Sequence, residues 1–315
     1  MDLGQAMSVA RWPPLCLVPS QCGSKIAHRS SSSQPRFRRS RRRSTVSVRA
    51  SMEEARSAIE VVRWAFSEDP ASWGAAMVAN GVIFALGFPL LRAGLTWPGV
   101  GNAYILGLVL WRAFGGQGLL VAAIYFCLGT GATKVKIKQK EAEGIAEKRS
   151  GKRGPASVWG SGSAGIVCAL AAASGIGGSD FLPLWKLAFV ASFSTKLSDT
   201  ISSEIGKAYG KTTYLVTNFS IVPRGTEGAV SLEGTAAGLV ASILLASAAW
   251  SLHEVDFSGA VICVISSQVA NFFESYLGAT LQGKPGFEWL NNDIVNVLNI
   301  AAGATLAILF KLSFM

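Results

Sequence analysis

The chain has 315 residues, of which 50% are hydrophobic and 15% are charged, and its mean hydropathy is +0.37. An ordinary soluble domain carries about 25% charged residues, so this composition excludes one and predicts a polytopic membrane protein. The net charge of +10 comes almost entirely from residues 1–50, which hold ten Lys or Arg and one acid. Because the remainder is nearly neutral, no basic domain is left to bind nucleic acid.

Residues 1–50 are rich in serine and arginine and poor in acids, which is typical of an organelle transit peptide. The segment lacks the long apolar core of a secretory signal, and Val48-Arg49-Ala50 resembles the processing site of chloroplast precursors. We therefore expect a chloroplast transit peptide that ends near Ala50. A mitochondrial presequence and a basic tail that stays attached are the alternatives.

The rest of the chain predicts an all-α membrane domain. Residues 51–71 mix charged with apolar side chains and predict an amphipathic helix at the membrane surface. Apolar stretches follow at 72–91, 97–111, 116–132, 157–177, 182–194, 235–252, 257–279 and 292–311. Because a spanning helix needs roughly 20 residues, we expect seven or eight transmembrane helices in a membrane domain over 72–312, with the shorter stretches tilted, kinked or re-entrant. The small residues of GSGSAG, at 160–165, favour close helix packing over a nucleotide loop.

Cysteine and histidine predict no metal or catalytic site. Cys127, Cys168 and Cys263 stand singly in apolar stretches, and His253 is alone at the end of one. Metal sites and histidine-based catalysis need clusters of such residues. We expect the three cysteines to serve core packing.

The loop from Lys134 to Arg153 holds eight Lys or Arg and three acids. By the charge-bias rule it should face the compartment where insertion began, which for a plastid protein is the stroma. Counting eight crossings places residues 195–235 and 280–293 on the same side. This predicts one stromal active face on a multi-pass protein of a chloroplast membrane, either the envelope or the thylakoid.

The stretch from Thr195 to Thr235 has the residue types that suit phosphate and a divalent cation. Two acids, Asp199 and Glu204, follow a hydrophobic run, with lysines, Arg224 and several glycines around and beyond them. On a helix, one face would carry Thr195, Asp199, Ser202 and Gly206. Ionisable residues at the end of a membrane segment usually turn toward protein, water or a ligand. A solvated helix end is the alternative.

Two further polar sets lie in the last third of the chain. One helical face can carry Gln268, Asn271, Ser275 and Gly278, with Glu274 beside it; another can carry Asn292, Asn296 and Asn299, with Asp293 beside it. Amides and carboxylates in apolar helices point into the bundle, where they line a pocket or bond neighbouring helices. Both uses stay open here.

Two motifs resemble elements of the CTP-dependent lipid kinases, such as dolichol kinase and phytol kinase. In DTISSEIGK, Asp199, Ser202 and Gly206 match an Asp-x-x-Ala-x-x-x-Gly element, with Ser in place of Ala. In RGTEG, residues 224–228 stand for a Lys-Lys-Thr-x-Glu-Gly element, with one basic residue in place of two and no residue between Thr226 and Glu227. A broader resemblance covers about residues 75–312. Four stretches together resemble an uncharacterised-membrane-protein family that contains plant phytyl-phosphate kinase. They are SDTISSEIGK, VPRGTEGAVSLEGT, ESYLGATLQ and NNDIVNVLN.

The resemblance implies phosphoryl transfer from a nucleoside triphosphate, with CTP the expected donor, to phytyl phosphate. The product would be phytyl diphosphate, for tocopherol synthesis and phytol salvage. The implied catalytic residues are Asp199, Glu204, Arg224 and Glu227, and the implied Mg²⁺ ligands are Asp199, Glu204 and Glu227. The implied nucleotide-binding residues are Ser202, Gly206, Lys207, Gly225, Thr226 and Gly228. We expect the lipid substrate at Lys152, Arg153, Asn271, Glu274, Asn292, Asp293 and Asn296.

Other functions fit parts of the pattern. A kinase for the free alcohol phytol would need a positioned base, whereas a phosphate acceptor is already largely ionised and needs extra cations instead. A transporter of an isoprenoid or a small anion should show related halves and carboxylates near the midplane. The chain has no clear internal repeat, and its acids cluster at helix ends. A non-catalytic membrane scaffold would not require the acids and Arg224 together.

Overall fold

The computed structural model describes residues 39–314, which fall into two units divided after Glu53. Helix α1 (Arg39–Ser67) begins in the first unit and ends in the second. Residues 1–38 of the predicted transit peptide lie outside the described residues, and cleavage near Ala50 would fall within α1. The helix predicted over 51–71 is present as far as Ser67, while its place at a membrane surface stays a prediction.

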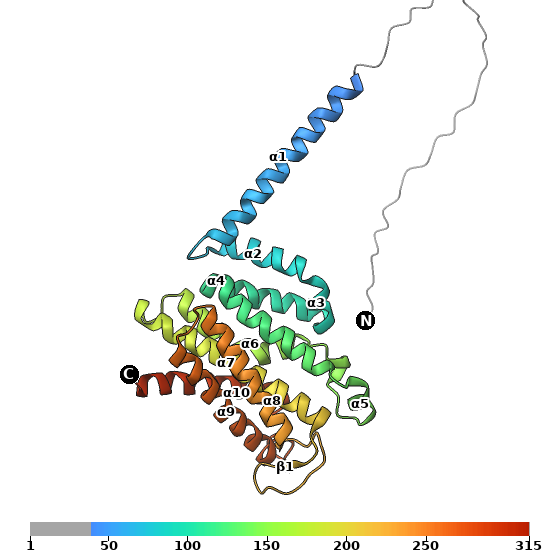
Figure 1. Cartoon of the computed structure of the whole chain (residues 1–315), viewed down its shortest axis with the longest axis vertical. Coiled ribbons are helices and arrows are strands. Elements are labelled where there is room, and N and C mark those ends of the chain that lie inside the picture. The colour runs from blue at the N-terminus through green and yellow to red at the C-terminus, as the bar shows by residue number, and fades with distance from the viewer. Residues whose placement is uncertain (1–38, 315) are drawn as a thin grey trace, which may run out of the picture. The chain divides into compact units, whose positions relative to one another are not determined.

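The second unit is built almost entirely of helices (Figure 1). They are α2 (Trp73–Leu86), α3 (Phe88–Gly94), α4 (Trp97–Lys134), α5 (Ile137–Ala142), η1 (Lys148–Gly151), α6 (Pro155–Ala173), η2 (Ser179–Phe181), α7 (Leu182–Tyr209), α8 (Leu232–Ser251), α9 (Phe257–Thr280) and α10 (Asn292–Ser313). Two short strands that were not predicted, β1 (Thr213–Leu215) and β2 (Ala229–Ser231), pair antiparallel between α7 and α8. The all-α membrane fold expected from the sequence is therefore present.

Among the described residues, five helices are long and apolar enough to cross a membrane: α4, α6, α8, α9 and α10. The pair α2 and α3, bent by 75°, makes a sixth if it forms one span. This count is lower than the seven or eight predicted but compatible with it. Helix α7 continues the predicted segment 182–194 for four further turns. Because these turns carry ionisable residues, α7 is not among the helices that are apolar enough to cross a membrane.

Helix α4 is folded back on itself at Gly115. This residue has φ 64° and ψ −157°, outside the helical region. A Cβ atom on Gly107 would lie 3.3 Å from Cδ1 of Leu119, although a straight helix would separate these two residues by about 18 Å. The two arms of α4 correspond to the predicted segments 97–111 and 116–132, and each is long enough to be a separate span (Figure 1).

We expect Gly115→Ala to destabilise this hairpin. The backbone conformation of Gly115 is one that essentially only glycine adopts, and forcing another residue into it costs about 1–3 kcal/mol. Thermal unfolding in detergent should show a lower Tm. The control is Gly101→Ala in the first arm, where an added Cβ meets nothing within 4 Å, and its Tm should not fall. Equal Tm values for the two variants would contradict a role for Gly115 in the fold-back.

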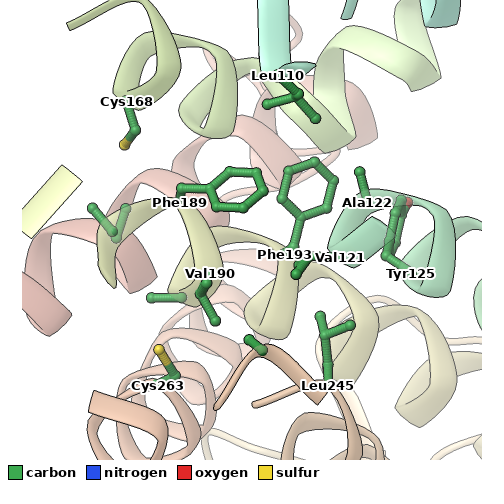
Figure 2. Close-up of a cluster of buried hydrophobic side chains, with 14 of the residues drawn as sticks. Leu110, Val121, Ala122, Tyr125, Cys168, Phe189, Val190, Phe193, Leu245 and Cys263 are labelled. Atoms are coloured by element: carbon green, nitrogen blue, oxygen red, sulfur yellow. The ribbon is translucent and has the colours of Figure 1, made fainter. Parts of the chain in front are cut away.

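Helix α7 lies at the centre of the second unit, packed against α4, α6, α8, α9 and α10. Its aromatic residues Phe189 and Phe193 are buried, with ring centroids 5.3 Å apart, and Tyr125 of α4 lies 5.5 Å from Phe193 (Figure 2). Glycines of α6 admit these large side chains, because a Cβ on Gly165 would lie 2.6 Å from the Phe193 ring. This confirms that GSGSAG serves helix packing. The core holds α7 so that its polar second half emerges beside the loops.

Candidate active site

A cavity of about 540 Å³ surrounds the second half of α7. Its walls come from the loop before α6, from the stretch between α7 and α8, and from the facing ends of α9 and α10. These are the three regions that the charge pattern predicted to share one face. Every residue predicted for the site lines this cavity: Lys152, Arg153, Asp199, Ser202, Glu204, Gly206, Lys207, Arg224, Gly225, Thr226, Glu227, Gly228, Asn271, Glu274, Asn292, Asp293 and Asn296.

The centre of the cavity is a charged cluster on Asp199. The Nζ atom of Lys196 lies 2.5 Å from Oδ2 of Asp199 and donates a second hydrogen bond of 2.5 Å to Oδ1 of Asn296. The carboxyl group of Glu274 on α9 lies beside that of Asp199. Lys196 was not among the predicted site residues, although its position three residues before Asp199 on a helix is a signal for such a pair. The structure thus adds a buried lysine to the site.

Amide side chains hold this cluster between three helices. Asn299 of α10 donates to Oδ1 of Asn271 at 3.0 Å and also to Glu274. Asn271 of α9 in turn donates to Oγ of Ser198 on α7, at 2.8 Å. Asn271 therefore bonds neighbouring helices and lines the cavity at the same time, whereas Asn299 bonds α10 to α9 without lining the cavity. They position Glu274 beside Asp199.

Glu204 does not fit its predicted role as a metal ligand. Its carboxylate forms an ion pair with Lys140, and both side chains are at most 2% exposed. Lys140 also donates to the backbone carbonyl of Thr133, at 2.9 Å. An acid whose charge is already balanced inside the protein has little left to offer a metal ion. Glu204 instead fastens α5 to α7.

Lys207, predicted to bind nucleotide, and Arg224, predicted to be catalytic, face acids of the α5–η1 loop. Lys207 lies 3.3 Å from Glu147, and Nη2 of Arg224 contacts both carboxylate oxygens of Glu143, at 3.0 and 2.9 Å. All four side chains are partly exposed, so these pairs are weak compared with a buried one. Phosphate oxygens entering the cavity could replace the loop carboxylates as partners of both cations.

The small residues predicted to contact nucleotide also pack helices. Gly206 faces Gly234 of α8, and a Cβ on Gly228 would lie 2.4 Å from the backbone oxygen of Ser275 on α9. Gly228 has φ 72°, which favours glycine. Gly225 likewise has a positive φ, and the Oγ1 atom of Thr226 donates to the carbonyl of Pro223 within the same turn. These residues shape the cavity wall through the backbone.

Asn271, Glu274 and Asn296 of the predicted substrate-binding residues belong to the central cluster, and the other four lie on other walls of the cavity. Lys152 and Arg153 form no ion pair with a described acid. Asn292 and Asp293 occupy the first turn of α10, whose N-cap is Asn291. The positive end of this helix and the two unpaired cations make these walls suitable for an anion.

The acids were also predicted to bind Mg²⁺, and the structure brings together a different set. Among residues 51–314, no three His, Cys, Asp or Glu side chains lie close enough to hold one ion, so Asp199, Glu204 and Glu227 do not form a joint site. Asp199 and Glu274 are adjacent, however, and Glu227 lies near enough to both to affect them electrostatically. Mg²⁺ is usually held by one or two carboxylates plus phosphate oxygens and water, which fits the pair Asp199 and Glu274.

Comparison with known proteins agrees with this architecture. Residues 80–304 match a family described as "Integral membrane protein DUF92". The chain is 57% identical over 240 residues to "Protein VTE6, chloroplastic" of Arabidopsis thaliana, covering 76% of this chain and 72% of that protein. It is 47% identical over 237 residues to an uncharacterized membrane protein of Synechocystis (75% and 90% covered), and 29% identical over 214 residues to one of Methanocaldococcus jannaschii (67% and 83% covered).

No solved structure matches the chain. The family match spans the helices from α2 to α10 and the whole of the cavity lining. The chain therefore belongs to the DUF92 family of integral membrane proteins.

Proposed function

We propose that this protein transfers a phosphoryl group from a nucleoside triphosphate, with CTP the expected donor, to phytyl phosphate. Similarity to a chloroplastic protein supports a chloroplast membrane as its location. The motifs DTISSEIGK and RGTEG, which resemble those of CTP-dependent lipid kinases, both line the cavity. The observation that carries the proposal is this cavity, in which an acidic centre and several cations meet beside membrane helices.

Phosphoryl transfer requires in-line positioning of two anions and neutralisation of their charge, with little covalent chemistry from the protein. The acceptor is a monoester whose second pKa is about 6, so its oxygen attacks without a strong base. The bond to the donor's γ-phosphorus forms as the bond to the β-phosphate oxygen breaks, and the nucleoside diphosphate leaves. Lys207 and Arg224 would offset the donor charge, and Lys152 and Arg153 that of the acceptor. Histidine is not needed, and His253, the one histidine in the described part of the chain, does not line the cavity.

Asp199 and Glu274 would hold Mg²⁺ in this proposal, with Glu227 nearby at the mouth of the cavity. When bound, the ion would supply positive charge that offsets the charge of the donor phosphates. Lys196 would keep Asp199 ionised and fixed against α10 through Asn296.

The proposal is tested in membranes that contain the protein, with phytyl phosphate or phytol, labelled CTP and Mg²⁺. Phytyl diphosphate formed from phytyl phosphate would support it. Product from phytol alone would favour the alcohol kinase, and no nucleotide-dependent product from either acceptor, in folded protein, would favour a transporter.

We expect Lys152→Met to raise the KM for phytyl phosphate about tenfold, because one unpaired cation of the acceptor wall is lost. The matched control is Lys284→Met, since Lys284 is exposed and does not line the cavity. Steady-state kinetics with CTP in excess would measure both variants. An unchanged KM in Lys152→Met would remove Lys152 from the acceptor site.

We expect the Mg²⁺ requirement to depend on pH through the carboxyl group of Glu227. Loss of hydration at the cavity mouth raises the pKa of this carboxyl above its ordinary value of 4.5, opposed by Lys207 and assisted by Glu147 and Asp199. As pH falls, Glu227 therefore gains a proton earlier than an exposed glutamate and loses its attraction for the ion. As the pH is lowered toward 4.5, the Mg²⁺ concentration for half-maximal rate should rise, and less so in Glu227→Gln. Identical profiles for the two proteins would contradict this role.

A further inference from the structure

A second cavity, of about 180 Å³, lies between α2, α3, the two arms of α4 and α6. Its lining is almost wholly apolar and includes Leu90, Leu91, Leu106, Leu119, Phe126 and Phe193. Three residues, Arg153, Ser157 and Ser161, line both this cavity and the polar one. The two spaces are therefore neighbours that share a wall at the start of α6.

Arg153 is the charged group on that shared wall. Its backbone is fixed, because its N–H donates to the carbonyl of Gly94 at 2.8 Å and its carbonyl accepts from Thr96 at 3.0 Å. Its Nη1 atom donates to the hydroxyl of Tyr125 at 2.9 Å, which holds the guanidinium against α4. A guanidinium has five N–H donors, and within residues 51–314 no carboxylate pairs with this one.

An anion is the natural partner for such a group. A partly buried arginine without an acid suits phosphate, which it can bind through two parallel hydrogen bonds. Because Arg153 borders both cavities, a phosphate bound there would have polar surroundings on one side and an apolar space on the other. A ligand that is anionic at one end and hydrocarbon at the other matches this arrangement.

The apolar cavity also opens to the outside of the helix bundle. Leu90 on α3 is 47% exposed, and Cys127 on the second arm of α4 is exposed as well. The prediction that Cys127 is a core residue was therefore wrong. Leu90 and Cys127 both line the cavity and belong to helices that are apolar enough to lie in a membrane. A hydrocarbon chain could therefore enter from the bilayer without passing through the polar cavity.

We propose that this cavity holds the part of the acceptor's isoprenoid chain next to its phosphate, with Arg153 bound to that phosphate. The assignment rests on the proposed function. Pockets for whole small molecules measure about 300–1,000 Å³, so a cavity of about 180 Å³ takes only a segment of a twenty-carbon chain. The rest of the chain lies among lipids outside the opening. The cavity thus selects for chain shape near the phosphate.

A cavity-filling variant tests the assignment through chain-length specificity. Ala103 lines the cavity from the first arm of α4, and Ala103→Phe would fill part of the space. The ratio of kcat/KM for phytyl phosphate to that for methyl phosphate, which has no hydrocarbon chain to fill the cavity, should fall at least tenfold. Ala85→Phe is the matched control. Ala85 is exposed on α2 and directly follows the lining residues Ile83 and Phe84, but it does not line the cavity itself, so the ratio should stay unchanged. If Ala103→Phe misfolds, Ala123→Phe from the other arm replaces it. An unchanged ratio in folded cavity variants would overturn the assignment.

A crosslinking experiment tests it without catalysis. The probe is a phytyl phosphate analogue with a diazirine close to the phosphate, photolysed with the full-length protein in detergent. Labelled peptides from α3, α4 or α6, reduced by excess phytyl phosphate and lost in Ala103→Phe, would support the cavity. Label confined to α9 and α10 would overturn it. Label in the cavity of a protein that phosphorylates no acceptor would keep the binding site and reject the kinase.

Discussion

Asp199→Asn is expected to lower the rate of phosphoryl transfer by about 10²–10³-fold while the protein stays folded. Asp199 lies on the cavity wall, ion-paired with Lys196 and adjacent to Glu274. Asparagine keeps the shape of the side chain and loses its charge, so it can neither attract Mg²⁺ nor balance Lys196. The loss should appear in kcat at saturating CTP and phytyl phosphate.

The control for this variant is Asp256→Asn. Asp256 is also paired with a lysine, Lys311 at 3.0 Å, but it caps α9 and does not line the cavity. It should keep wild-type activity. Lys196→Met should resemble Asp199→Asn in activity, since both disrupt the same pair. Near-normal turnover in folded Asp199→Asn would show that the chemistry takes place elsewhere.

Glu204→Gln is expected to destabilise the protein by about 3–5 kcal/mol, because it leaves the buried charge of Lys140 without a partner. Thermal unfolding in detergent should show a large decrease in Tm. The double variant Lys140→Met/Glu204→Leu removes both charges, and most of the lost stability should return. Asp256→Asn again supplies the comparison, because its pair with Lys311 is more exposed and should contribute less than about 1 kcal/mol.

The same variant separates a structural role of Glu204 from a metal-binding one. If Glu204 only fastens α5 to α7, the folded fraction of Glu204→Gln should need the same Mg²⁺ concentration as the wild type. A large increase in that concentration without a change in Tm would restore Glu204 to the predicted ligand set.

Much of the fold follows from local patterns. Apolar runs of nearly spanning length predict helices, and the structure has helices at each of these positions. The two arms of α4 were also predictable as separate apolar segments, because Gly115 and Gly116 interrupt the apolar sequence between them. The strands β1 and β2 were missed, since two three-residue strands are held by their pairing and give no periodic signal of their own.

The site was predictable as a set of residues but not as a set of partners. Polar and charged side chains in apolar surroundings indicate a cavity, and each predicted residue lines the same one. Spacing on α7 could not reveal that Glu204 meets Lys140, because these residues are 64 positions apart. It also could not show that Glu274 of α9 takes the place beside Asp199.

The sequence by itself determined the membrane class, the helical architecture and the residues that carry charge. These are local properties, because the hydrophobicity and length of a segment decide whether lipid can surround it. Only the tertiary structure decided which charges neutralise one another, that Lys196 joins the site, and that an apolar cavity adjoins Arg153. Such pairings depend on how α4, α6, α7, α9 and α10 pack, and the energy of a buried charge depends on its nearest neighbours across helices.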